Sequence, residues 1–263
     1  MEQEKSVLEL ASSLARAAGR LQRERYGTGL EIRTKSAAVD LVTDVDESCE
    51  ALIVSALEAE RPEDAILAEE GGARDRSGAA WRWIIDPLDG TTNYAHGYPR
   101  FCVSIGVELE GVRTVGVVYD PLMDELYHAV VGRGAFLNGR RIHVSEETAL
   151  DRSLLATGFA YDRRKSRQDN LEEFASFLKA ARALRRDGSA ALDLCYVAAG
   201  RLDGFWEFKL APWDVAAGYL IVEEAGGRCS DISGGPPPAS GDAVVASNGQ
   251  IHQAILDVLK TVR

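Results

Sequence analysis

Four short acidic segments combine carboxylates with places where a predicted strand ends or a predicted helix begins. Carboxylate oxygens without nearby Cys or His ligands favour a hard cation such as Mg²⁺ over zinc. Gathered at one place, these segments would therefore form a magnesium site. Their acidic residues are Asp44 and Asp46 in LVTDVD, Glu69 and Glu70 in LAEEGG, Asp86 and Asp89 in IIDPLDGTT, and Asp214 in APWDVAAG.

The segment WIIDPLDGTT combines two carboxylates with a phosphate-binding pattern. A predicted strand over 81–85 ends at Asp86, Pro87 bends the chain, and Asp89 follows. The GTT at 90–92 offers backbone N–H groups at a predicted helix start, which suits a phosphate. Because carboxylates repel a bare phosphate, the pattern indicates that cations lie between the two.

Each segment by itself has an ordinary structural explanation. DPLDG is commonly a turn, EEGG a solvated loop, and PWD a helix N-cap, since Asp is a favoured capping residue. Asp44 and Asp46 fit equally well as a cap and a dipole partner of the second predicted helix. The occurrence of all four segments in one chain, at strand and helix ends, favours a functional site.

With these segments the sequence resembles the inositol monophosphatase family of magnesium-dependent, lithium-sensitive phosphatases. The resemblance covers essentially the whole chain. WIIDPLDGTTNYAHGYP matches the family's first signature, and PWDVAAGYLIVEEAGG matches its second. The segments 42–46 and 69–71 match two shorter elements.

The resemblance implies a set of metal ligands and a pair of residues that act on water. Glu69 and Asp86 would hold a first Mg²⁺ together with the backbone carbonyl of Leu88. Asp86 would bridge to a second ion held by Asp89 and Asp214, and a third, weaker ion would lie near Glu69. The residues implied to orient and deprotonate the attacking water are Asp46 and Thr91.

The resemblance also implies substrate contacts. Glu207 matches an acid that binds inositol hydroxyls, and this role is favoured over the structural alternative, an exposed acid at a strand end. Gly188, Ser189 and Ala190 match a segment that approaches those hydroxyls. The remaining implied contacts are Asp89, Gly90, Thr91 and Asp214 around the phosphate, and Lys35 near the site.

The implied activity is Mg²⁺-dependent hydrolysis of inositol-1-phosphate to inositol and phosphate by a metal-activated water, which makes the chain a phosphoric monoester hydrolase. One alternative is another phosphatase of the superfamily, acting on fructose-1,6-bisphosphate, histidinol phosphate or a 3′-phosphoadenosine nucleotide. Another is a regulatory binding protein with secondary phosphatase activity, as some bacterial relatives bind the transcription machinery.

The elements that would position these residues change character along the chain. Residues 1–144 combine helices over about 7–26 and 45–60, a turn or hairpin over 31–38, and a period-two pattern from Phe101 that predicts an antiparallel meander. Residues 145–263 alternate strands with helices, including one over 170–184, as in an α/β layer. We therefore expect an α+β or α/β fold in two parts, and the resemblance implies a layered αβαβα sandwich.

Composition excludes several classes of protein. The chain has 263 residues, 46% of them hydrophobic, and a net charge of −11, which excludes bulk disorder and argues against general nucleic-acid binding. Four scattered Cys without a CxxC motif fit a reducing compartment. Without a predicted signal peptide or membrane span, we expect a cytoplasmic protein. The family resemblance also implies that the protein forms a homodimer.

Overall fold

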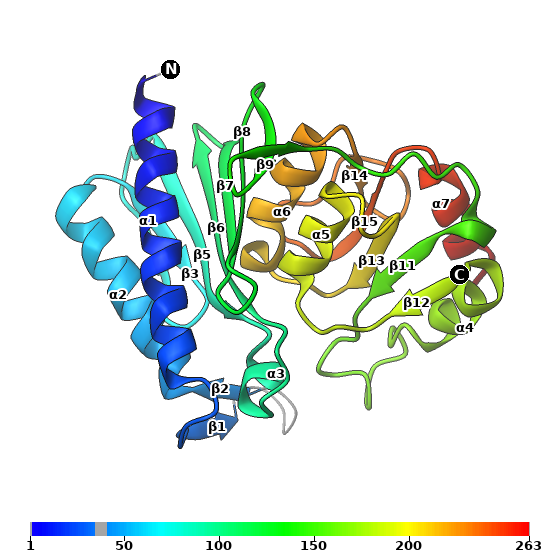
Figure 1. Cartoon of the computed structure of the whole chain (residues 1–263), viewed down its shortest axis with the longest axis horizontal. Helices are drawn as coiled ribbons and strands as arrows, with labels where there is room; N and C mark the ends of the chain where they lie inside the picture. The colour runs from blue at the N-terminus through cyan, green and yellow to red at the C-terminus, as the bar shows by residue number, and fades with distance from the viewer. Residues whose placement is uncertain (1, 35–40, 263) are drawn as a thin grey trace.

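The computed structural model describes residues 2–34 and 41–262, and within them the chain forms five layers (Figure 1). One pair of helices covers the outer face of an eight-stranded sheet, a second pair lies between this sheet and a five-stranded sheet, and a third pair covers the far face. This arrangement confirms the αβαβα sandwich. The three pairs are α1 (Glu2–Arg25) with α2 (Asp44–Glu60), α5 (Ala190–Ala198) with α6 (Pro212–Glu224), and α4 (Leu171–Ala180) with α7 (His252–Val262).

The eight-stranded sheet contains the predicted antiparallel meander. Its strand order is β10-β9-β8-β7-β6-β5-β3-β4, and only β3 and β5 pair in parallel. The strands are β3 (Ala65–Ala68), β4 (Gly72–Arg74), β5 (Trp81–Asp89), β6 (Cys102–Leu109), β7 (Val112–Asp120), β8 (Glu125–Val130), β9 (Gly134–Leu137) and β10 (Arg140–Ile142).

Strand β5 is longer than the sequence predicts. It continues past Ile85 to Asp89 and pairs with β6 on both sides of an irregularity between Asp86 and Asp89. Pro87 lies inside this irregularity, where its missing N–H leaves no gap in the ladder. The Gln22 side chain donates to the Pro87 carbonyl over 2.7 Å. The short helix α3 (Thr91–Ala95) follows, as the GTT pattern predicts.

The five-stranded sheet has the order β12-β11-β13-β15-β14 and corrects one expectation. The helix predicted over 170–184 ends at Ala180, and 183–185 form an edge strand that pairs in parallel with β11. Sheet pairing here overrides the helical preference of an Ala- and Leu-rich segment. The strands are β11 (Leu154–Thr157), β12 (Ala183–Arg185), β13 (Gly204–Phe208), β14 (Arg228–Ser230) and β15 (Ala243–Ser247).

Two short elements complete the fold. Strands β1 (Ile32–Thr34) and β2 (Leu41–Thr43) pair antiparallel, as expected for a hairpin, while the residues between them lie outside the described ranges. A single 3₁₀ turn, η1 (Leu150–Arg152), precedes β11.

The middle helices bring the two parts of the chain together. Side chains of α5 and α6 share one buried cluster with residues of both sheets. Gly106 on β6 and Gly116 on β7 face each other across the ladder, and a Cβ on Gly106 would lie 2.6 Å from the Cβ of Ala216 on α6. These glycines therefore allow α6 to approach the sheet closely, beside the end of β5.

Candidate active site

Three aspartates meet where β5 ends and α6 begins. Asp86, Asp89 and Asp214 each offer a carboxylate oxygen within 4.8 Å of the others. Asp86 is 1% exposed and Asp89 is 8% exposed. Burial, followed by the neighbouring carboxylates of Glu69, Asp89 and Asp214, raises the pKa of Asp86 well above its ordinary value.

This cluster fits a divalent cation by its donor chemistry. Asp86 forms no ion pair with Lys or Arg within residues 2–34 and 41–262, so no described cation offsets the repulsion it receives. Buried charges persist when they are paired or bind a metal, and a set of carboxylate oxygens suits Mg²⁺. The chain's own residues thus leave a place for positive charge.

Glu69 and Leu88 border the same space. A hollow of about 280 Å³ is lined by Glu69, Leu88 and Thr91 as well as the three aspartates. Glu69 follows β3, and its backbone N–H donates to the Ile85 carbonyl over 3.2 Å. The parallel pairing of β3 with β5 therefore places Glu69 beside Asp86, whose pKa it raises.

Asp46 and Thr91 meet although they are far apart in sequence. The Thr91 hydroxyl lies 2.8 Å from Oδ1 of Asp46 and 3.1 Å from the Leu88 carbonyl. The other oxygen of Asp46, Oδ2, accepts a hydrogen bond from the backbone N–H of Thr43 over 2.9 Å. Asp46 is fully buried, so its orientation is fixed from both sides.

Asp46 and Asp214 act as capping residues and also face the site. Both occupy the third position of a helix and accept from the N-cap backbone, Asp46 from Thr43 and Asp214 from Ala211 over 2.6 Å. One carboxylate oxygen of each thus fixes the helix start. The structure thus confirms a capping role at the helix start for both residues, and this role leaves their predicted place in the site open.

Two buried residues support the site without having been identified from the sequence. Glu50, on α2, accepts the backbone N–H of Glu70 over 2.8 Å and so holds the loop that carries Glu69. Gln22, on α1, holds Pro87. The four-residue spacing of Asp46 and Glu50 puts both on one helix face, which is the signal that could have found Glu50; no local signal marks Gln22.

A larger cavity of about 540 Å³ adjoins the aspartates. Asp89, Gly90, Gly188, Ala190, Glu207 and Asp214 line it, together with basic residues that include Arg163, Arg186 and Lys209. Burial and the carboxylate of Asp214 raise the pKa of Glu207 well above its ordinary value. A Cβ on Gly158 would lie 2.0 Å from the Glu207 carboxylate, so only glycine leaves room for that group.

One of the implied substrate contacts, Ser189, does not line this cavity. Ser189 is 1% exposed, and its hydroxyl donates to Oδ2 of Asp89 over 2.7 Å. Lys35 lies outside the described residues.

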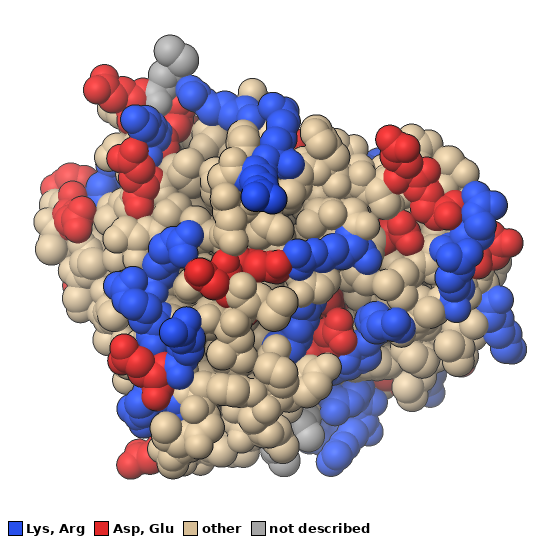
Figure 2. Space-filling view, viewed as in Figure 1, with Lys and Arg blue, Asp and Glu red and all other residues tan. Residues whose placement is uncertain are grey.

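The net negative charge of the chain does not dominate the face drawn in Figure 2, where Lys and Arg are at least as prominent as Asp and Glu. None of the described helices is long and apolar enough to cross a membrane.

Comparison with known proteins identifies the family. The model of the inositol monophosphatase family matches residues 3–263. This chain belongs to the inositol monophosphatase family. An inositol-1-monophosphatase of Synechocystis sp. is 47% identical, with 96% of this chain and 88% of that protein covered.

Other similar proteins agree on the fold and differ in name. The solved structure of inositol monophosphatase from Anabaena has a TM-score of 0.89 and 42% identity, and covers 98% of this chain and 97% of its own. A protein of Pseudomonas aeruginosa named Nus factor SuhB is 44% identical over 97% of this chain and 96% of its own length. Membership of this family supports a phosphatase. The similar proteins are named either inositol monophosphatase or Nus factor SuhB.

Proposed function

We propose that this protein hydrolyses inositol-1-phosphate to inositol and phosphate in a Mg²⁺-dependent reaction. The observation that carries the proposal is the cluster of Asp86, Asp89 and Asp214, of which the first two are buried, beside the Asp46–Thr91 pair. Carboxylates alone would repel a phosphate monoester, so this arrangement makes chemical sense with cations bound. The names of the Synechocystis and Anabaena relatives support the choice of substrate.

Asp86, Asp89, Asp214, Glu69 and the Leu88 carbonyl are the groups that would hold two to three Mg²⁺ ions. When bound, such ions neutralise the phosphate, acidify a water molecule and stabilise charge on the leaving oxygen. The chain's own contribution is to hold the ligands still, since positioning and electrostatics dominate phosphoryl transfer. Asp86 lies at the centre of the set.

The Thr91–Asp46 pair would orient the attacking water and receive its proton. When the Thr91 hydroxyl donates to Oδ1 of Asp46, its own oxygen keeps lone pairs that could accept a hydrogen bond from the water. Asp46 cannot turn away, because the backbone of Thr43 holds its other oxygen. The pair thus acts as a general base, an effect that typically contributes 10²–10⁴-fold in rate.

Gly90 and Thr91 would donate backbone N–H groups to the phosphate, and the sugar would extend toward Glu207. Glu207, Gly188 and Ala190 line the cavity on that side. An acid that accepts two neighbouring hydroxyls discriminates against analogues that lack them. We place Glu207 in that role, and Lys35 near the site on the family resemblance alone.

Phosphate release by the purified protein tests the proposal. Inositol-1-phosphate and fructose-1,6-bisphosphate are compared side by side, with Mg²⁺ and after EDTA. We expect release from inositol-1-phosphate that EDTA abolishes, and a slower reaction with the bisphosphate. Equal rates would support a phosphatase of the superfamily without a preference for inositol-1-phosphate. The absence of Mg²⁺-dependent release from either substrate would contradict a sugar phosphatase.

The relative named Nus factor SuhB supports a second candidate function, a regulatory binding protein with secondary phosphatase activity. An Asp89→Asn variant separates the two candidates in cells that lack the wild-type gene. Failure to restore growth or metabolism favours the phosphatase, whereas full restoration favours the binding role. In either case we propose a cytoplasmic protein, and the family resemblance suggests a homodimer.

A further inference from the structure

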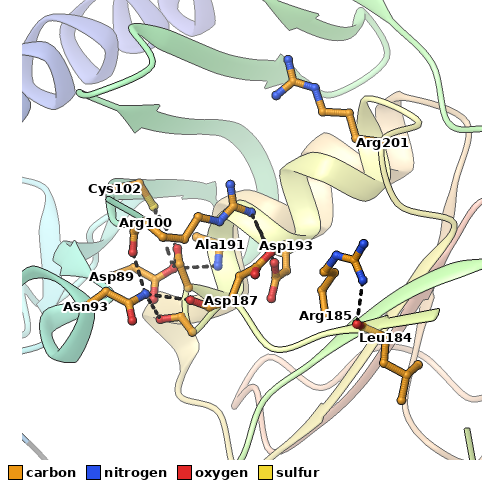
Figure 3. A network of polar contacts seen from close by, with 12 residues as sticks. Asp89, Asn93, Arg100, Cys102, Leu184, Arg185, Asp187, Ala191, Asp193 and Arg201 are labelled. Atoms are coloured by element: carbon orange, nitrogen blue, oxygen red, sulfur yellow. Dashed lines mark hydrogen bonds and ion pairs between the residues drawn. The ribbon is translucent and has the colours of Figure 1, made fainter. Parts of the chain in front are cut away.

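We infer that Ser189 and Arg100 are positioning residues that hold the start of α5 against Asp89 and thereby set the affinity of the aspartate cluster for its divalent cation. The inference rests on the proposed metal site. It concerns residues of both parts of the chain that meet beside the aspartates (Figure 3).

The first observation is the set of donors on one oxygen of Asp89. Oδ2 accepts from the Ser189 hydroxyl over 2.7 Å and from the Ala191 backbone N–H over 2.8 Å. The Cys102 thiol also lies 3.8 Å from this oxygen. The donors fix the rotation of the carboxylate, and groups that orient a metal ligand in this way are part of a metal site's affinity.

The Ser189 side chain contacts Asp89 and does not cap its own helix. It occupies the N-cap position of α5, where a serine oxygen ordinarily accepts from a backbone N–H of the first turn. Its side chain makes no such bond. Instead Asp89, from the other part of the chain, accepts the Ala191 N–H and caps α5 in its place, which leaves the Ser189 hydroxyl to donate to the same carboxylate.

Asn93 anchors the segment before α5. Its side-chain amide donates to the carbonyls of Asp187 and Arg100, each over 2.7 Å, and lies 3.3 Å from the Gly188 carbonyl. Asn93 belongs to α3, directly after Asp89. The residues that follow Asp89 therefore hold the residues that precede Ser189.

Arg100 provides the charged part of this connection. It is 8% exposed, and its guanidinium lies 3.4 Å from Oδ1 of Asp193 and 3.9 Å from the Asp187 carboxylate. It also stacks on Tyr196, with its central carbon 3.9 Å from the ring centre. Asp193 is on α5, one turn beyond Ser189, so Arg100 connects the first turns of this helix to the segment that leads into β6.

Arg201 gives a matched control within the same region. It also lies over the Tyr196 ring, at 4.8 Å, and forms an ion pair with Glu125. Arg201 comes after the far end of α5 and points away from the Asp89 network in Figure 3. It shares the residue type, the aromatic partner and the ion pairing of Arg100 without the connection to Asp89.

Calorimetric titration of Mg²⁺ into the EDTA-stripped full-length protein tests the inference. We expect Ser189→Ala to weaken Mg²⁺ binding about 10-fold, the lower end of the range for residues that orient metal ligands. Ser189→Thr keeps the hydroxyl and should stay within about threefold of wild type. The double variant R100M/D193L, which leaves no unpaired buried charge, should weaken binding about as much as Ser189→Ala.

Thermal unfolding of each metal-free variant serves as the fold control, and kcat and KM at rising Mg²⁺ provide a second readout. Kinetically, kcat of Ser189→Ala should recover at saturating Mg²⁺ while KM for the substrate stays close to wild type. Arg201→Met should bind Mg²⁺ like the wild type.

Each contrary result has a distinct meaning. If the wild type binds no Mg²⁺, the proposed metal site itself is wrong. If the wild type binds Mg²⁺ and Ser189→Ala binds it equally well, the inference is overturned. It is also overturned if Arg201→Met weakens binding as much as R100M/D193L, or if Ser189→Thr loses as much as Ser189→Ala, because packing rather than the hydrogen bond would then set the affinity.

Discussion

The proposed site has two sides, the aspartate cluster and the larger cavity beside it, and the chain holds the first more firmly than the second. At the aspartate end, Asp46, Asp86 and Asp89 are buried, and hydrogen bonds from Ser189 and Ala191, in the other part of the chain, fix Asp89. At the other end, Arg163 and Arg186 come from the segments 158–169 and 182–189, which contain many exposed residues.

This difference separates the reaction from the choice of substrate. The groups proposed for catalysis lie at strand and helix ends within the packed layers, so their geometry follows from the fold. The groups proposed to select the substrate lie partly on surface segments, where sequence change costs little stability. The account therefore expects a shared reaction with a substrate preference set by a few residues at the outer end.

Removing one carboxylate at the aspartate end should give the largest effect. Asp86→Asn weakens every proposed metal contact, and a loss of several kcal/mol of charge stabilisation corresponds to about 10³-fold in kcat. Metal-free Asp86→Asn should nevertheless unfold at a higher temperature than the wild type, because it removes a repelled buried charge. Steady-state kinetics and thermal unfolding in EDTA measure both effects.

Asp120→Asn is the control for that variant, since Asp120 is equally buried but accepts from the backbone of Leu122 and Met123, away from the cavity. Its kcat should stay close to wild type. An active Asp86→Asn enzyme would show that the aspartate end does not carry the reaction.

The loss of the Thr91 hydroxyl should give the next effect. Thr91→Val keeps the shape of the side chain but removes the group bonded to Asp46, and we expect kcat to fall about 10²-fold, the lower end of the range for a general base. Mg²⁺ affinity should not change. Thr114→Val, which loses a hydroxyl bonded to the Val112 carbonyl, is the matched control, and an equal loss in both variants would contradict the role of Thr91.

A change at Glu207, which lies on β13 and lines the substrate side of the cavity, should alter the substrate preference and not the reaction. Glu207→Gln should raise KM for inositol-1-phosphate about 10-fold, because hydroxyl recognition of this kind discriminates by 10-fold or more. Its kcat with p-nitrophenyl phosphate, which lacks the hydroxyls, should stay close to wild type. A similar loss with both substrates would place Glu207 in the reaction and remove the proposed difference between the two ends.

The smallest expected effect is a dependence of stability on pH in the absence of metal. Folded Asp86 keeps its proton to a higher pH than unfolded Asp86, because burial and the nearby carboxylates raise its pKa. Its contribution to stability is therefore present below the ordinary carboxyl pKa and is lost as pH rises through the folded pKa.

In EDTA, the unfolding temperature of the wild type should consequently fall relative to that of Asp86→Asn as pH rises above the ordinary carboxyl pKa. Saturating Mg²⁺ should remove the difference by stabilising the wild type. A difference in unfolding temperature that stays constant with pH would mean that burial and the neighbouring carboxylates do not raise the pKa of Asp86.

The sequence predicted the parts of the site whose signal is local. A carboxylate that follows an apolar strand or starts a helix is visible in a few residues, so Asp86, Asp89 and Asp214 could be selected before any contact was known. The layered fold followed from the change of periodicity and the family signatures. Both the αβαβα arrangement and the meander are confirmed.

The parts that could not be predicted depend on contacts between distant segments. No local pattern near Arg100 predicts its contact with Asp193, which lies 93 residues away in the sequence. The sequence also does not determine whether the hydroxyl of Ser189 faces solvent, substrate or its own helix. The helix predicted over 170–184 stops early because β11 offers a pairing partner to 183–185. Likewise, β5 extends to Asp89 because β6 continues the ladder beyond the irregularity.

Anomalous diffraction from crystals soaked in Mn²⁺, a substitute for Mg²⁺ at oxygen sites, tests the central claim most directly. We expect at least two peaks within coordination distance of the carboxylates, one between Glu69 and Asp86 and a second between Asp86, Asp89 and Asp214. Crystals of Asp86→Asn should lose at least one of these peaks. Strong Mn²⁺ peaks elsewhere, with none between these aspartates, would contradict it.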